Sequence, residues 1–195
     1  MGRTQTFETA EVVRSARSVF WERGFEEASV PELEAATGVR RSSLYHAFGS
    51  KRGLFDAAVQ SYLDEVVRPR LAPLARDDVA PDALEVYFGG LRTALSDTAT
   101  LSSRSGCLLL NAAGAPIARD DAVREVIAEY RAELLHAMRA GVSARWPEAE
   151  PSWRALQADL LVSLLVAALV LARVDPEQSV ATVGAALALV REPAA

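Results

Sequence analysis

The segment over residues 29–51 constrains the fold more than any other part of the chain. Ser29 is followed three residues later by Glu32, the spacing of a capping box, so a helix is expected to begin directly after Ser29. Gly38 is expected to end this helix, because glycine adopts left-handed backbone angles without steric cost. The apolar face of the helix consists of three residues at helical spacing: Val30, Leu33 and Ala36. A second short helix over residues 40–48 completes the outline of a helix-turn-helix.

The second helix of this segment offers hydrogen-bond donors and no carboxylate, since neither Asp nor Glu occurs between Arg40 and Arg52. Donors at the start of a helix reach base edges when the helix lies in the major groove of DNA. Tyr45 and Lys51 suit phosphate oxygens, which set the register of binding. The residues that we predict to contact DNA are Ser29, Arg40, Arg41, Ser42, Ser43, Tyr45, His46 and Lys51. A helix pair with a solvated basic face explains the spacing equally well.

The N-terminal region resembles the DNA-binding domain of TetR-family transcriptional regulators. The resemblance rests on matches at fixed spacing: Val12, Val13, Ser15, Ala16, Val19, Phe20, Gly24, Phe25, Ser29, Val30, residues 35–39, Leu44, Tyr45, residues 48–51 and Leu54. Two positions depart from the family pattern. Arg40 stands where a Ser or Thr often caps the recognition helix, and Ala47 stands where a His or an aromatic residue often precedes the Phe.

The resemblance implies an all-α protein with two parts. A helix-turn-helix DNA-binding domain would occupy residues 1–50, and a ligand-binding and dimerisation domain would occupy residues 51–195. In the family, the helix expected to begin at Lys51 joins these parts and transmits ligand binding to the DNA-reading head. The protein would then bind a near-palindromic operator as a homodimer, most often as a repressor, and respond to a small apolar or reactive effector.

The composition is that of a folded chain whose positive charge is concentrated in one segment. Half of the 195 residues are apolar, so the chain can form a substantial core. The formal net charge of -5 excludes DNA binding through overall positive charge, but the window over residues 40–52 is purely basic. A single cysteine forms no internal disulfide, and no secretory signal is visible, so we expect a cytoplasmic protein.

The remainder of the chain is expected to be helical. The predicted helices cover residues 6–23, 51–63, 81–98, 106–111, 120–146, 153–173 and 176–190, with a polar loop over residues 100–105. The longest apolar run, over residues 160–172, is shorter than the ~20 residues of a membrane span, so we expect a buried helix and no membrane contact. Trp21 lies off the apolar stripe of the first helix, and its environment is not predicted.

The last two helices are the predicted dimer interface. The first is apolar over most of its circumference, and such a helix must be buried on every side. The family pairs its last two helices into a four-helix bundle, and an internal core is the alternative explanation. The predicted contact residues are Leu161, Leu164, Leu165, Ala168, Val180, Val183 and Leu187.

A cavity between body helices is the predicted effector site, lined by apolar walls and a few polar groups. The predicted lining residues are Tyr87, Phe88, Leu91, Cys107, Asn111, Tyr130, Leu134 and Trp153. Cys107 follows Gly106 at an expected helix N-terminus, where a thiolate is stabilised, and Arg104 is close in sequence. An electrophile- or redox-responsive regulator using Cys107 is therefore an alternative, although a free cysteine often packs simply as a small apolar residue.

Enzymatic chemistry is not expected. His46 and His136 are the only histidines and are too far apart in sequence to indicate a metal site. The chain contains no nucleophile, zinc or phosphate-binding motif, so we expect no catalytic residues, no metal and no cofactor. A helical interaction module that has lost DNA binding is the other alternative.

Overall fold

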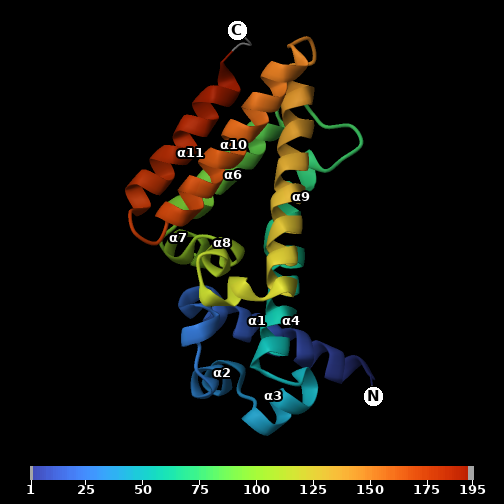
Figure 1. Ribbon diagram of the computed structural model, residues 1–195, viewed down its shortest axis with the longest axis vertical. Helices are drawn as coiled ribbons and strands as arrows, with labels where there is room; N and C mark the ends of the chain where they lie inside the picture. Colours follow the sequence, from blue (N-terminus) through green and yellow to red (C-terminus); the bar gives the residue numbers. More distant parts are fainter. Residues whose placement is uncertain (1, 193–195) are drawn as a thin grey trace.

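The computed structural model describes residues 2–192, with side chains from Thr9 onward. All regular elements in this range are helices, and they form a small head below a larger body (Figure 1). The head contains α1 (Gly2–Glu27), α2 (Val30–Thr37), α3 (Arg41–Phe48) and the start of α4 (Lys51–Tyr62). The predicted all-α fold with an N-terminal helix-turn-helix is confirmed.

The body continues from α4 without a break. A π-helical turn (Leu63–Val67), α5 (Arg68–Leu71) and a 3-10 turn (Ala72–Leu74) extend α4, and α6 (Ala83–Ser96) follows a loop. The short helices α7 (Leu101–Ser105) and α8 (Leu108–Ala113) lie next to the head, and a 3-10 turn (Pro116–Arg119) leads into α9 (Asp121–Arg145). The last two helices, α10 (Pro151–Leu171) and α11 (Pro176–Arg191), lie side by side, and α11 also packs against α6 (Figure 1).

Local capping explains why most predicted helix boundaries agree with the structure. The hydroxyl oxygen of Ser50 accepts a hydrogen bond from the N–H of Gly53, so α4 begins at the residue expected. Asp120 caps α9 by accepting bonds from the N–H groups of Ala122 and Val123. Gly24 has φ 81° and interrupts α1 at the predicted position.

Two features of the body differ from prediction. Residues 101–105 form the short helix α7 instead of a loop, because the hydroxyl of Thr100 caps it by accepting from Ser103 N–H. Helix α10 has 21 residues and mean hydropathy 1.9, which is long and apolar enough to cross a membrane by length and composition alone. Only 33% of its most apolar window is buried, so α10 is not buried on every side within the chain.

The predicted division between head and body falls at Ser50, and one continuous core crosses it. Phe20 of α1 packs edge-on against Phe55 of α4, with ring centroids 5.3 Å apart. Farther along the same two helices, Arg17 donates to the backbone and hydroxyl oxygens of Ser61 and pairs with Glu65. Helices α1 and α4 are therefore fastened together along their length, and the domain boundary stays a prediction.

Candidate nucleic-acid interface and ligand cavity

The helix-turn-helix is built by caps at both of its helices. Ser29 accepts from the N–H of Glu32, and the Glu32 carboxylate accepts in return from the backbone N–H of Ser29 at 2.9 Å. These bonds from Ser29 lower the pKa of Glu32. Gly38 ends α2 with φ 69°, so the capping box and the left-handed glycine are both confirmed. Of the predicted apolar face, Leu33 is buried, Val30 is half-buried, and Ala36 is exposed because α2 has only 8 residues.

Helix α3 takes its N-terminal cap from α2 and not from its own sequence. Arg40 occupies the N-cap position and makes no side-chain cap bond. Instead, Oε1 of Glu34 accepts a hydrogen bond from the backbone N–H of Arg41 at 2.6 Å. A carboxylate at a helix N-terminus is also favoured by the helix dipole. The departure from the family pattern at Arg40 is therefore compensated by a tertiary contact within the helix pair.

The exposed face of α3 contains most of the predicted DNA contacts. Leu44 is buried and fixes the helix against the head, while Tyr45 is half-buried with the Arg41 guanidinium 5.0 Å from its ring centroid. The exposed donors lie at the first turns of α3 and on its outer side: Arg40, Arg41, Ser42, Ser43 and His46. This arrangement suits insertion of the N-terminal half of α3 into a major groove.

Two of the residues predicted to contact DNA form hydrogen bonds within the head. The hydroxyl of Ser29 donates to the Glu32 carboxylate at 2.8 Å as part of the capping box. The ammonium of Lys51 donates to the backbone oxygen of Glu26 at 3.3 Å and lies 4.7 Å from the ring centroid of Phe25. Burial lowers the pKa of Lys51, and the charges of Glu26 and Glu32 oppose this shift. Lys51 therefore links α4 to the end of α1.

Side chains of α1 attach the head to the body, and sequence patterns did not indicate them. Trp21 is buried, donates from Nε1 to the carbonyl oxygen of Gly106 at 3.2 Å and packs edge-on against Tyr62. Glu26 accepts from the backbone N–H of Ile117 at 2.7 Å. Trp21 lies off the apolar stripe of its helix because its partners come from the body, and helical periodicity reports only one packing face.

A second attachment joins the start of α4 to the start of α9. The guanidinium of Arg52 pairs with Asp120 at 2.6 Å and donates from Nε to Asp56 at 2.8 Å. The hydrogen bonds to Asp120 and Asp56 raise the pKa of Arg52, and the bond from Arg52 is the main reason that the pKa of Asp120 is lowered. The residue that caps α9 is thus also the residue that holds α4.

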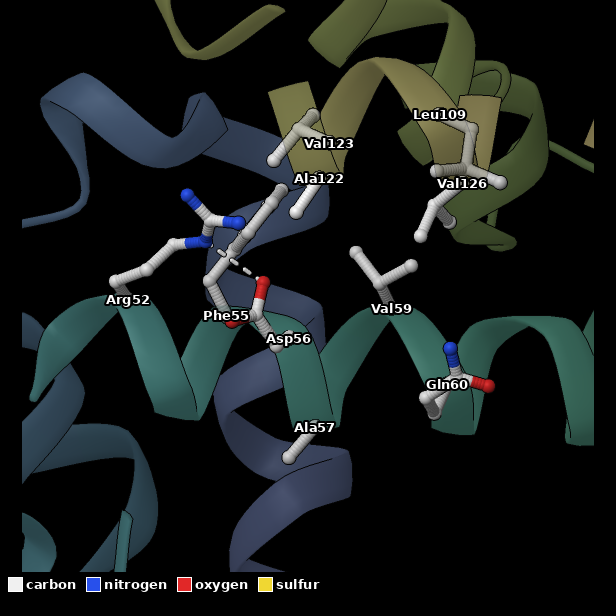
Figure 2. Close-up of a pocket in the computed structure, with 10 residues that line it drawn as sticks. All are labelled: Arg52, Phe55, Asp56, Ala57, Val59, Gln60, Leu109, Ala122, Val123 and Val126. Atoms are coloured by element: carbon white, nitrogen blue, oxygen red, sulfur yellow. Dashed lines mark hydrogen bonds and ion pairs between the residues drawn. The ribbon is translucent and has the colours of Figure 1, made fainter. Parts of the chain in front are cut away.

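A cavity of about 300 Å³ lies beside this ion pair, between α4 and the starts of α8 and α9 (Figure 2). Its size is at the lower end of the range of small-molecule sites. Figure 2 shows Val59 pointing from α4 toward Val123 and Val126 of α9. Arg52 and Gln60 lie at opposite ends of the labelled residues of α4. The lining residues are Arg52, Phe55, Asp56, Ala57, Val59, Gln60, Leu109, Ala122, Val123 and Val126.

None of the predicted effector-binding residues lines this cavity. Four of them, Tyr87, Leu91, Tyr130 and Leu134, line a separate space of about 20 Å³, which is too small for more than about one water molecule. The other four are used in packing: Phe88 is buried against Tyr87, Asn111 donates to the carbonyl of Ser105, and Trp153 packs on Trp146. The predicted site is therefore filled by its own side chains.

Cys107 lies beside this small space and is fully buried. Its sulfur is 3.4 Å from the hydroxyl oxygen of Tyr130. Burial raises the pKa of Tyr62 and of Tyr130, and the neighbouring Cys107 contributes to both shifts. Cys107 directly precedes α8, as predicted, but Arg104 is exposed and pairs with Glu22 of α1.

Five of the seven predicted dimer contacts are buried within the single chain. Leu161, Leu165, Ala168, Val183 and Leu187 are each at most 5% exposed and form the core between α10, α11 and the rest of the body. Only Leu164 and Val180 are half-buried. The exposed stripe of α10 instead repeats at alternating steps of four and three residues: Leu156, Leu160, Ser163, Ala167 and Val170.

Comparison with known proteins identifies relatives of this chain. The family model for bacterial regulatory proteins of the tetR family matches residues 12–58. The HTH-type transcriptional repressor BdcR of Escherichia coli is 34% identical over 127 residues, and the repressor ComR of the same organism is 30% identical over 111 residues. These matches cover 63% and 56% of this chain but only 62% and 51% of the relatives' own lengths.

A solved structure extends the similarity to nearly the whole chain. The TetR-family transcriptional regulator CifR, as a cysteine mutant complexed with 26-bp double-strand operator DNA, is 32% identical with a TM-score of 0.73. That match covers 91% of this chain and 94% of CifR. The reduced form of NemR from Escherichia coli has a TM-score of 0.75 at 18% identity, a likeness of fold.

Proposed function

Because this chain belongs to the TetR family of bacterial transcriptional regulators, we propose that it is a repressor that binds operator DNA through α3 and releases it on binding a small effector. The observation that supports DNA binding most directly is the capped α3 with its exposed, carboxylate-free row of donors. Arg40 and Arg41 at its start would meet base edges, and the hydroxyls of Ser42 and Ser43 would meet bases or phosphates. The repressor would act in the cytoplasm.

We propose that the active form is a homodimer that pairs through the exposed faces of α10 and α11. The stripe on α10 has the spacing of a coiled-coil seam, and Leu156, Leu160 and Val170 are 55%, 41% and 50% exposed in the single chain. Three exposed positions in the middle of α11 are alanines, which permit close approach: Ala181, Ala185 and Ala188. Two-fold pairing would present two α3 helices to half-sites about 34 Å apart, hence a near-palindromic operator.

Fluorescence anisotropy tests the DNA-binding proposal. Labelled DNA from upstream of the protein's own gene is titrated at two salt concentrations, with random DNA as competitor. Tight binding that falls with salt and resists the competitor is expected. No salt-dependent binding to any DNA would contradict the proposal and favour an interaction module without DNA binding.

The dimer proposal has its own test. Leu160→Arg places a charge in the exposed stripe and is expected to give a monomer by light scattering, while Val86→Arg on the exposed side of α6 leaves the mass unchanged. A monomeric parent, or a dimer in Leu160→Arg, would contradict this interface.

A reactive-thiol response is a second candidate, favoured by the hydroxyl of Tyr130 next to the Cys107 sulfur. Complete burial of Cys107 limits access of a reagent. Cys107→Ser decides between the candidates, since it abolishes a thiol response and spares release by a reversible ligand.

A further inference from the structure

The cavity between α4 and α9 has a mainly apolar lining and therefore suits an apolar ligand, called the guest below. Its walls are made mainly by Phe55, Val59, Leu109, Val123 and Val126, which come from three helices separated in sequence. Phe55 and Leu109 are almost completely buried, so the floor of the cavity is part of the protein core. Burial of apolar ligand surface against such walls is favourable.

Charges at the cavity select against anions. Arg52 directs Nε to Asp56 and its two terminal nitrogens to Asp120, so each of its three nitrogens already has a carboxylate partner. The guanidinium at the rim is therefore outnumbered by the carboxylates of Asp56 and the adjacent Asp120, with which a ligand carboxylate would compete for Arg52. Like charges close together are destabilising, so an anionic guest is disfavoured.

Gln60 is the uncharged polar residue among those that line the cavity. Gln60 lies two turns along α4 from Arg52, about 12 Å at 1.5 Å per residue, and its exposed amide makes no hydrogen bond in the part of the chain that the structure describes. A hydroxyl or carbonyl on an apolar guest would pair with this amide, which both donates and accepts.

The position of the cavity couples a guest to the recognition helix. A guest between α4 and α9 presses on the two helices that the Arg52–Asp120 ion pair joins. The start of α4 is in turn packed tightly on the end of α3, because a Cβ placed on Gly53 would lie 2.0 Å from the Phe48 carbonyl oxygen. A displacement of α4 therefore displaces α3.

We propose that this cavity, and not the space around Cys107, is the effector site, and that its ligand is an uncharged, compact apolar molecule with one hydroxyl or carbonyl group. The inference rests on the proposed function for its regulatory consequence. The ligand releases the operator because it binds better to a conformation in which α4 and α9 are farther apart.

The test uses the full-length protein and two probes with one ring system, 1-naphthalenemethanol and 1-naphthoate, titrated calorimetrically without DNA. We expect the alcohol to bind and the carboxylate to bind at least about tenfold more weakly. Val126→Phe fills the cavity and is expected to weaken alcohol binding at least about tenfold. Ala128→Phe adds the same ring at an exposed position two residues along α9 and should leave binding unchanged.

Operator affinity then separates this inference from the proposed function. The alcohol should weaken operator binding by the parent and by Ala128→Phe but not by Val126→Phe. If Val126→Phe is unfolded by circular dichroism, Ala122→Phe at the exposed rim of the same cavity replaces it. No alcohol binding, equal binding of the two probes, unchanged binding in the filled variant, or probe binding that leaves operator affinity unchanged would overturn the inference. Failure of the ligand-free protein to bind any operator would instead overturn the proposed function.

Discussion

Removal of the Glu34 carboxylate should loosen the recognition helix without affecting the rest of the head. Glu34 Oε1 is the side-chain cap of α3, since Arg40 supplies none. Loss of such a cap costs about 0.5–2 kcal/mol. Alanine is a slightly better helix former than glutamate, so the substitution also stabilises α2 by roughly a few tenths of a kcal/mol. The expected net loss for Glu34→Ala is about 1 kcal/mol, or a fall of roughly 2–4 °C in Tm for a chain of this size.

Glu34→Gln is the matched control, because its amide oxygen still accepts from the N–H of Arg41 while the charge is lost. Thermal unfolding and operator anisotropy are measured for both variants. The alanine variant should bind the operator more weakly than the parent, because an uncapped α3 loses order at the turn that contains Arg41. Equal Tm and equal operator affinity in Glu34→Ala and the parent would refute the assignment of Glu34 as the cap of α3.

Three further predictions concern two DNA contacts and the acid stability of the Arg52–Asp120 ion pair. Arg41→Ala should weaken operator binding and relax base preference by about 1–3 kcal/mol at one position, measured by anisotropy with single-base operator variants. Lys51→Ala should weaken binding to all sequences and reduce the salt slope by about one, and a slope equal to the parent's would contradict a phosphate contact. The pKa of Asp120 is lowered by its bond from Arg52, so its contribution to stability is present above its ordinary value of 3.8 and is lost as the pH falls through the lower folded value. Chemical unfolding from pH 7 to pH 3 should therefore show a smaller loss of stability in Asp120→Asn than in the parent.

The helix-turn-helix could be predicted in detail because its determinants are local in sequence. The capping pair Ser29 and Glu32 is three residues apart, and Gly38 needs no partner to adopt its backbone angles. The cap of α3 was not predictable in the same way, because Glu34 reaches it from a different helix. Local rules identify where a helix begins but not which distant side chain completes it.

The predicted effector residues and most of the predicted dimer contacts are packed in the core of the single chain, for a related reason. Aromatic and apolar residues such as Phe88 and Leu134 were predicted to line a cavity, but their bulk fills the space instead. The cavity of about 300 Å³ lies instead between α4 and the starts of α8 and α9, and its position depends on how these helices pack, which sequence spacing does not report. For α10, apolar residues surround the helix, so periodicity alone cannot distinguish the inner face from the outer one.

The joint at Gly106 relates the head to the proposed dimer helices. Trp21 holds the head by donating to the Gly106 carbonyl, and the other side of Gly106 lies directly against α10, where an added Cβ would be 1.9 Å from the Leu169 carbonyl oxygen. The backbone at Gly106 also has φ 63°, which disfavours a side chain. Since α10 would form the dimer seam, this contact helps to set the position of each α3 relative to the two-fold axis, together with the Glu26–Ile117 and Arg52–Asp120 contacts. Ligand-driven movement of α4 must therefore either preserve the contact and pivot the head about it, or break it and release a buried carbonyl at a cost of about 1–3 kcal/mol. Pivoting is the less costly route, and it changes the separation of the two recognition helices while the dimer stays intact.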